Sequence, residues 1–150
     1  MKPNGIHRLE ESDLTVYRNL MELFAVEFEE NDTYQGAKPS DSYVRSLLRN
    51  DDIIFLTECK ESVVTGGLVA YILKKFEQQR SEIYIYDLAV RSGWRRQGIA
   101  TRLIEHLKII AKSQGAWVIF VQADHGDDPA IKLYESLGVR EEVLHFDIKP

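Results

Sequence analysis

Apolar side chains recur at steps of three and four residues near the start of the chain, which is the spacing of one helical face. This face comprises Leu14, Tyr17, Leu20, Met21, Phe24, Ala25 and Phe28. Ser12 or Asp13 precedes it as an N-cap, because a short polar side chain accepts a hydrogen bond from the first turn. A short strand is predicted before this helix, over residues 6–9, and the polar segment 30–39 ends the helical pattern.

A second, shorter helix is predicted over residues 40–50, with Ser40 or Asp41 as its cap. The hydrophobic pattern then changes from helical spacing to continuous runs of β-branched and apolar residues. Two such runs, 53–59 and 63–73, are joined by a short polar segment, which predicts a hairpin.

Strands and helices alternate in the second half of the chain. The predicted strands cover residues 81–90, 116–124 and 139–148. One helix presents Leu103, Ile104, Leu107, Ile110 and Ala111 on one face before Gly115, and another, within residues 126–138, has Asp127 or Asp128 as its cap, Pro129 in its first turn and Gly138 at its end. The order β-α-α-β-β-β-α-β-α-β predicts an α/β fold over residues 1–150: one domain, with a mixed central sheet and helices on both faces.

Composition and charge narrow the classes of function. The net charge of −5 argues against nucleic acid as the main partner. The chain has no signal-peptide pattern and no run of about 18 apolar residues, so we expect a cytoplasmic protein without a membrane partner. The four histidines are scattered, and no metal site is predicted. The single cysteine, Cys59, lies in an apolar run, which favours packing over nucleophilic chemistry.

The stretch Arg95-Arg96-Gln97-Gly98-Ile99-Ala100-Thr101 joins the strand 81–90 to the following helix. A helix N-terminus presents unpaired N–H groups and partial positive charge. Gly98 and Ala100 leave the backbone accessible, and the two arginines add charge, so the stretch is suited to a pyrophosphate. It has neither the Gly-Lys-Ser/Thr of an ATP-binding loop nor the three glycines of a dinucleotide turn. The alternative is a solvated basic loop that leads into a helix.

A carboxylate, Asp87, lies inside a strand otherwise built mainly of apolar and aromatic residues. A charged group in such a strand is costly unless it has a partner or a chemical role. It is therefore the first candidate for a general base, with Glu82 and Asp124 as weaker candidates. The alternative role for Asp87 is structural, bonded to a nearby loop.

Arg95-x-x-Gly98-x-Ala100, directly after a strand ending in Leu-Ala-Val, resembles the coenzyme A pyrophosphate loop of the GCN5-related N-acetyltransferase superfamily. The predicted element order resembles that fold across the chain. Within the superfamily, residues 75–90, 95–101, 121–143 and 145–148 resemble the type I aminoglycoside 3-N-acetyltransferases. The resemblance implies acetyl-CoA as cosubstrate, direct attack of the 3-amine of a 2-deoxystreptamine antibiotic on the thioester, and antibiotic resistance as the outcome.

The resemblance also implies roles for particular residues. The backbone of Leu88, Ala89 and Val90 would pair with the pantetheine arm, and an N–H near Leu88 would polarise the thioester carbonyl. Tyr134 would donate a proton to the leaving thiolate, although its helical spacing also suits a core residue.

An aminoglycoside is a polycation, so its pocket needs carboxylates. On loops near the opening of the sheet, the resemblance implies Asp124, Asp127, Glu142 and Asp147 as candidates. Each also suits a solvated face or a helix cap. The resemblance further implies a homodimer, and the edge of the predicted strand 139–148 is a plausible contact.

Two alternative functions remain at this point. One is the same acetyl transfer to a polyamine, another small metabolite or a protein N-terminus. The other is a non-catalytic sensor that binds acyl-CoA without turnover.

Overall fold

The computed structural model describes residues 2–150, which divide into two compact units. The first unit ends at Phe120, and the second comprises Val121–Pro150. The elements of the first unit are β1 (Gly5–Arg8), α1 (Leu14–Glu27), α2 (Asn31–Gln35), α3 (Asp41–Arg49), β2 (Ile53–Lys60), β3 (Val63–Lys74), β4 (Ser81–Val90), α4 (Ile99–Ser113) and all but the last residue of β5 (Ala116–Val121).

The five strands form one sheet in the order β1-β2-β3-β4-β5, and β1 to β4 pair antiparallel. The predicted hairpin is confirmed, and its turn places Glu61 and Ser62 at φ of 51° and 64°. Two successive residues at positive φ are typical of the type I′ turn, whose twist matches that of the flanking strands. The predicted strand at residues 81–90 coincides with β4.

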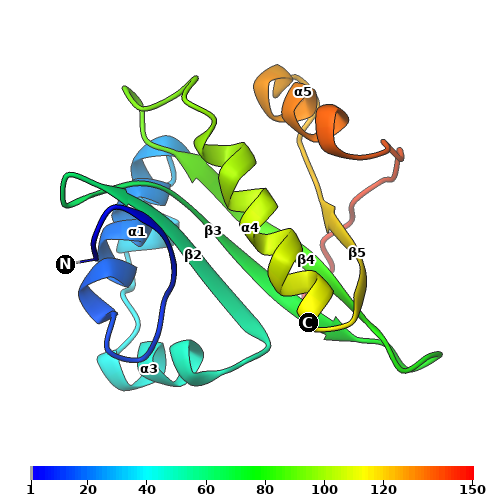
Figure 1. The fold of residues 1–150 in the computed structure, drawn as a ribbon, viewed down its shortest axis with the longest axis horizontal. Coiled ribbons are helices and arrows are strands. Elements are labelled where there is room, and N and C mark those ends of the chain that lie inside the picture. The colour runs from blue at the N-terminus through cyan, green and yellow to red at the C-terminus, as the bar shows by residue number, and fades with distance from the viewer. Residues whose placement is uncertain (1) are drawn as a thin grey trace. The chain divides into compact units, whose positions relative to one another are not determined.

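Helices cover both faces of this sheet, as the sequence predicts. The helices α1 and α3 bury Leu20, Phe24 and Val44 against Phe55 and other residues of one face. On the other face, α4 contacts β2, β3 and β4 and runs along the sheet in Figure 1. Within residues 2–150, every helix is too short or too polar to span a lipid bilayer.

Two neighbouring glycines in β3 let the helices approach the sheet closely. A Cβ added at Gly66 would lie 2.7 Å from Cγ2 of Ile99 in α4. A Cβ added at Gly67 would point to the opposite face, 2.8 Å from the backbone oxygen of Leu56 and closer still to Leu20 of α1. Successive strand residues face opposite sides, so the pair serves both helix layers.

Replacing Gly67 by alanine is expected to lower the free energy of unfolding by about 1–3 kcal/mol, because the methyl group overpacks a full core. Urea denaturation measures this loss. Gly138→Ala is the matched control, because Gly138 has an ordinary extended φ and its added Cβ would meet nothing closer than 3.8 Å. Equal stability of the two variants would contradict the close packing at Gly67.

The second unit contains one helix, α5 (Asp128–Leu137). The predicted start and stop are confirmed: the side chain of Asp127 accepts a hydrogen bond from the N–H of Ala130, Pro129 lies in the first turn, and Gly138 follows the last. Asp127 therefore has the capping role that the sequence left open.

The predicted strand over residues 139–148 is wrong for the chain as described, because residues 139–150 form neither helix nor strand. A strand exists only where a neighbouring backbone supplies hydrogen bonds, and Val121–Pro150 taken by itself offers no second strand. The apolar side chains of Val143, Leu144 and Phe146 are exposed. The proposed contact between edge strands thus loses its basis, and the homodimer stays a prediction.

Two further elements differ from the predicted pattern. The strand β5 ends at Val121 rather than at residue 124. The segment 30–39, predicted only as a break, contains the five-residue helix α2. A helix this short has too few turns to show a repeating apolar face.

Candidate active site

A bulge in β4 precedes Asp87. Val69 of β3 pairs with Asp87, whereas the next residue, Ala70, pairs with Ile85. Tyr86 is therefore the extra residue in β4. Bulges of this kind bend a strand and change the direction of its side chains, and they are frequent beside active sites.

The carboxylate of Asp87 is part-buried and has one partner on another element. The hydroxyl of Tyr34, on α2, donates a hydrogen bond to Oδ2 of Asp87 at 2.7 Å. Burial raises the pKa of Asp87 above its ordinary value, the Tyr34 hydrogen bond opposes this shift, and the charge of Glu30 adds to it. A carboxylate with a raised pKa is a stronger base than a solvated one.

The second half of β4 extends beyond β5. Tyr84 stacks on Phe120 with ring centroids 4.7 Å apart, and Arg80 lies over the ring of Trp117, 4.2 Å from its centroid. These contacts place β5 alongside the first half of β4, in parallel, as Figure 1 also shows. Since β5 ends at Val121, it does not extend along residues 88–90. The strand β5 therefore leaves the backbone groups of these three residues on this edge unpaired, as a ligand that binds as an added strand would require.

One arginine of the loop after β4, Arg95, is paired with a carboxylate of α1. Glu27, only 5% exposed at its side chain, accepts hydrogen bonds from the N–H and hydroxyl of Ser92 and from the guanidinium of Arg95 at 2.7 Å. The shape of the loop therefore depends on α1. Arg96 stays exposed, and no ion pair of its side chain is found within residues 2–150.

The turn into α4 is made by a glycine in the left-handed region. Gly98 has φ of 76°, and no side chain among residues 2–150 caps the first turn of the helix. The first-turn N–H groups thus remain available to an anion. The side chain of Ile99 is buried, so this residue can offer only its backbone to a ligand.

The sequence reasoning missed an arginine that supports this turn. Arg102 donates to the backbone oxygen of Gln97 at 2.6 Å and pairs with Glu58 of β2 at 2.7 Å. It braces the loop against the sheet from one turn inside α4. Its position in the run Thr-Arg-Leu did not indicate this role, because arginines on the surface of helices are common.

Exposed tyrosines lie near Asp87. Tyr71 and Tyr86 meet edge to face with centroids 5.8 Å apart, and Tyr84 contacts Tyr86 at the same distance. Tyr86 is 61% exposed and Tyr71 38%. Tyrosine faces attract ammonium groups, so this patch suits a cationic ligand.

The remaining predicted residues lie in the second unit. Burial raises the pKa of Tyr134, on α5, to about 12, and the charge of Asp127 contributes. Glu142 pairs with Arg140 at 2.7 Å, and Asp147 contacts His145 at 2.9 Å. Asp124 is exposed. The structure does not place these residues relative to Asp87, so their roles stay predictions.

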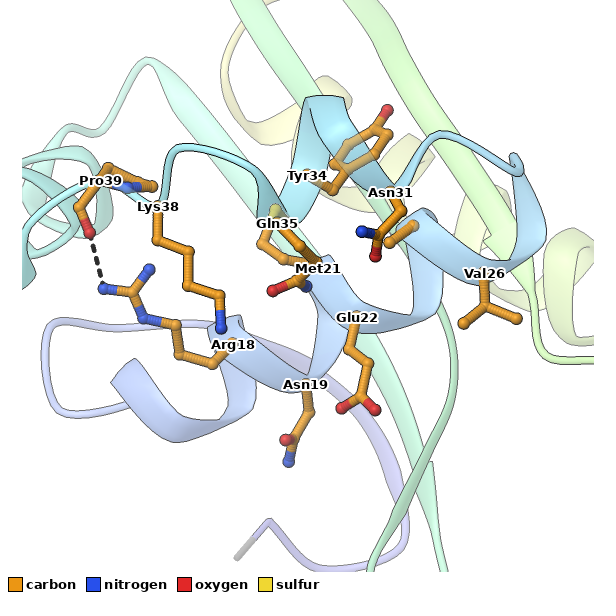
Figure 2. Close-up of a pocket in the computed structure, with 11 residues that line it drawn as sticks. Arg18, Asn19, Met21, Glu22, Val26, Asn31, Tyr34, Gln35, Lys38 and Pro39 are labelled. Carbon is orange, nitrogen blue, oxygen red and sulfur yellow. Dashed lines mark hydrogen bonds between the residues drawn. The ribbon is translucent and has the colours of Figure 1, made fainter.

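A pocket of about 480 Å³ lies between α1 and the segment that follows it. Figure 2 shows Arg18, Glu22 and Lys38 around it, whereas the ring of Tyr34 points away from these three side chains. Asp87 does not line this pocket. Because Arg18 and Lys38 are both cationic, the pocket is a poor site for a polycation.

The single cysteine and the possible metal ligands are the remaining features of residues 2–150 that bear on chemistry. Cys59 is buried in the hydrophobic core, and burial raises the pKa of its thiol, which confirms its packing role. No three His, Cys, Asp or Glu side chains within these residues are arranged to hold a metal ion.

The fold and the loop together define a class of protein: an α/β protein whose fourth strand has an open end and leads through a glycine turn into an uncapped helix. Residues 17–139 match the acetyltransferase (GNAT) family. The chain belongs to this family, which uses acetyl-CoA. The fold class and family predicted from the sequence are thus confirmed.

Solved structures similar to this chain include two aminoglycoside acetyltransferases from uncultured soil metagenomic samples. One is 50% identical with a TM-score of 0.96, and 99% of each chain is covered. The other, in complex with sisomicin, is 32% identical with a TM-score of 0.90, covering 97% of this chain and 95% of that chain.

Curated proteins similar to this chain include two N-acetyltransferases, one from a plant and one from a bacterium. A chloroplastic GCN5-related N-acetyltransferase 4 of Arabidopsis thaliana is 41% identical over 82 residues, which are 52% of this chain and 28% of that protein. The ribosomal protein bS18-alanine N-acetyltransferase of Escherichia coli K12 is 30% identical over 69 residues, 46% of this chain and 47% of that protein. The chain thus matches half or less of the length of these relatives.

Proposed function

We propose that this chain transfers an acetyl group from acetyl-CoA to the 3-amine of a 2-deoxystreptamine aminoglycoside. The observation that carries this proposal is the part-buried carboxylate of Asp87 beside the open end of β4. Similarity to an aminoglycoside acetyltransferase over 99% of the chain supports the substrate class. Acetylation removes one positive charge from the antibiotic and would weaken its binding to RNA, giving resistance.

The residues present suit coenzyme A. The first-turn N–H groups of residues 99–101 and the exposed cation of Arg96 would hold the diphosphate, and Gly98 has no Cβ to keep it away. The backbone of Leu88–Val90 would pair with the pantetheine arm. Arg95 and Gln97 act through the loop, since Arg95 is bonded to Glu27 and the oxygen of Gln97 to Arg102.

Each proton in the transfer has a proposed carrier. The substrate ammonium passes a proton to the carboxylate of Asp87, and the neutral amine attacks the thioester carbonyl. An N–H near Leu88 stabilises the negative charge that develops on the carbonyl oxygen. The departing sulfur takes a proton from Tyr134, whose raised pKa keeps the phenol protonated at neutral pH. As the amide forms, the attacking nitrogen releases its second proton, which returns to the Tyr134 phenolate directly or through solvent.

The amine substrate would lie against the exposed tyrosines, with Asp87 at one end. Glu30 adds negative charge near Asp87. Asp124, Asp127, Glu142 and Asp147 remain proposed contacts for the other ammonium groups. Asp127 already caps α5, so its carboxylate has less freedom to bind a ligand than the other three.

Purified protein with acetyl-CoA is expected to release thiol in the presence of gentamicin or sisomicin. Mass spectrometry should show a single added acetyl group, and NMR should place it on the 3-amine. Thiol release without aminoglycoside is the background control. An aminoglycoside panel without turnover would contradict the proposal, and acetylation at another amine would contradict its site.

A second candidate is acetylation of a protein N-terminus, which the similarity to the ribosomal protein alanine N-acetyltransferase favours. Peptides with N-terminal alanine, together with spermidine as a polyamine, test it in the same assay. Binding of acetyl-CoA with no turnover on any of these amines would instead indicate a non-catalytic sensor.

A further inference from the structure

Tyr34 connects the short helix α2 to the candidate base. Its hydroxyl donates to Oδ2 of Asp87 at 2.7 Å, across 53 positions of sequence. The five-residue helix that carries it lies between α1 and α3 and has no buried residue. The hydrogen bond therefore links this polar segment directly to β4.

The ring of Tyr34 packs against two phenylalanines: Phe24 within α1, and Phe28, which caps the C-terminal end of α1. Its centroid lies 5.7 Å from that of Phe24 and 5.9 Å from that of Phe28, and these two rings stack on each other at 5.4 Å. Phe24 is fully buried. Aromatic packing of this kind fixes the orientation of the ring, and the ring in turn directs the hydroxyl toward Asp87.

The hydroxyl of Tyr34 stays protonated and serves as a donor to Asp87. Burial, the bond to Asp87 and the nearby charge of Glu30 raise its pKa far above the ordinary value, so the phenol stays protonated. An ionised carboxylate has two accepting oxygens. Tyr34 engages Oδ2 and leaves the lone pairs of Oδ1 for another partner.

Besides Tyr34, the charged group that acts on Asp87 is the carboxylate of Glu30, which raises the pKa of Asp87. Burial raises the pKa of the phenols of Tyr71 and Tyr84, and the charge of Asp87 contributes to both shifts. The hydrogen bond from Tyr34, by contrast, lowers the pKa of Asp87. It opposes the effects of burial and of Glu30.

We propose that Tyr34 is a positioning residue for acetyl transfer, which orients the carboxylate of Asp87 so that Oδ1 takes the proton of the substrate ammonium. The proposal rests on the proposed function, in which Asp87 is the base. The transfer converts an ammonium and a carboxylate into a neutral amine and a carboxylic acid, and Tyr34 keeps its own proton throughout.

Tyr34→Phe tests this role, because it keeps the ring against Phe24 and Phe28 and removes only the hydroxyl. We expect kcat to fall about tenfold, as for loss of one hydrogen bond to a charged group, with an unchanged KM for acetyl-CoA. Loss of the bond also raises the pKa of Asp87, so the acid limb of the pH profile should move to higher pH. Tyr43→Phe is the matched control, since Tyr43 is 57% exposed on α3.

A double substitution and a titration separate the possible failures. Tyr34→Phe should cost nothing more in an Asp87→Asn background. If Asp87→Asn lowers kcat but Tyr34→Phe changes neither kcat nor the pH profile, the positioning role is wrong. If the unsubstituted protein acetylates no amine, the proposed function fails, and NMR titration of the Asp87 carboxyl carbon still tests Tyr34. A higher titration midpoint in Tyr34→Phe shows that Tyr34 holds the ionised carboxylate of Asp87, as the positioning role requires, and an unchanged midpoint overturns that role.

Discussion

Replacing Asp87 by asparagine is expected to lower kcat by about 10²- to 10⁴-fold, the usual contribution of general base catalysis. Asparagine has nearly the same shape, and its amide oxygen can still accept the hydrogen bond from Tyr34, so the fold should persist. Affinity for coenzyme A should also persist, since its proposed contacts lie elsewhere. Steady-state kinetics and calorimetry measure the two effects separately.

The pH profile and a control variant complete this test. Because burial raises the pKa of Asp87, activity should be full above that pKa and fall as the pH drops through it. The asparagine variant should lack this acid limb. Glu82→Gln is the matched control, because Glu82 lies on the same strand and pairs with Lys75 at 3.5 Å. Activity that depends on Glu82 and not on Asp87 would reverse the assignment of the base.

Replacing Gly98 by valine is expected to weaken coenzyme A binding at least about tenfold, the factor that 1.4 kcal/mol produces. A β-branched residue is strained at the φ of 76° that Gly98 adopts, and its side chain would crowd the start of α4. An added Cβ would already lie 3.3 Å from a guanidinium nitrogen of Arg102. Calorimetry with coenzyme A measures the loss.

Gly115→Val separates backbone strain from loss of the site. Gly115 has φ of 69°, follows the other end of α4, and has open space around an added Cβ. Both variants should lose comparable stability, but only the one at Gly98 should lose affinity. Unchanged affinity at Gly98, or the same loss in both, would show that the diphosphate does not depend on this turn.

Most of the regular elements were predictable from local pattern. The strand 81–90 and the caps Ser40 and Asp127 follow from alternation, period and short polar side chains, which act over a few neighbouring residues. Asp87 could be chosen as a candidate base from local sequence too, because it is a charged residue in a run of apolar and aromatic residues. The family followed from the glycine turn after that strand.

The partners of the site residues were not predictable in this way. Tyr34 stood in a segment expected only to break a helix, and nothing in its surroundings indicates a bond to a residue 53 positions later. Glu27 appeared as part of a helix, yet it holds Ser92 and Arg95. The bulge at Tyr86 depends on the pairing of β4 with β3, which neither strand encodes alone.

The amino-acid sequence by itself determined most of the helices and strands, the family of the chain, and the presence of a carboxylate and a glycine turn on either side of one strand end. These features arise from interactions between near neighbours. Only the tertiary structure decided what Asp87 bonds to, which arginine of the loop pairs with a carboxylate, and that residues 139–148 form no strand within their own unit. Those outcomes depend on which distant segments supply a donor, a counter-ion or a neighbouring backbone, and folding alone brings such segments together.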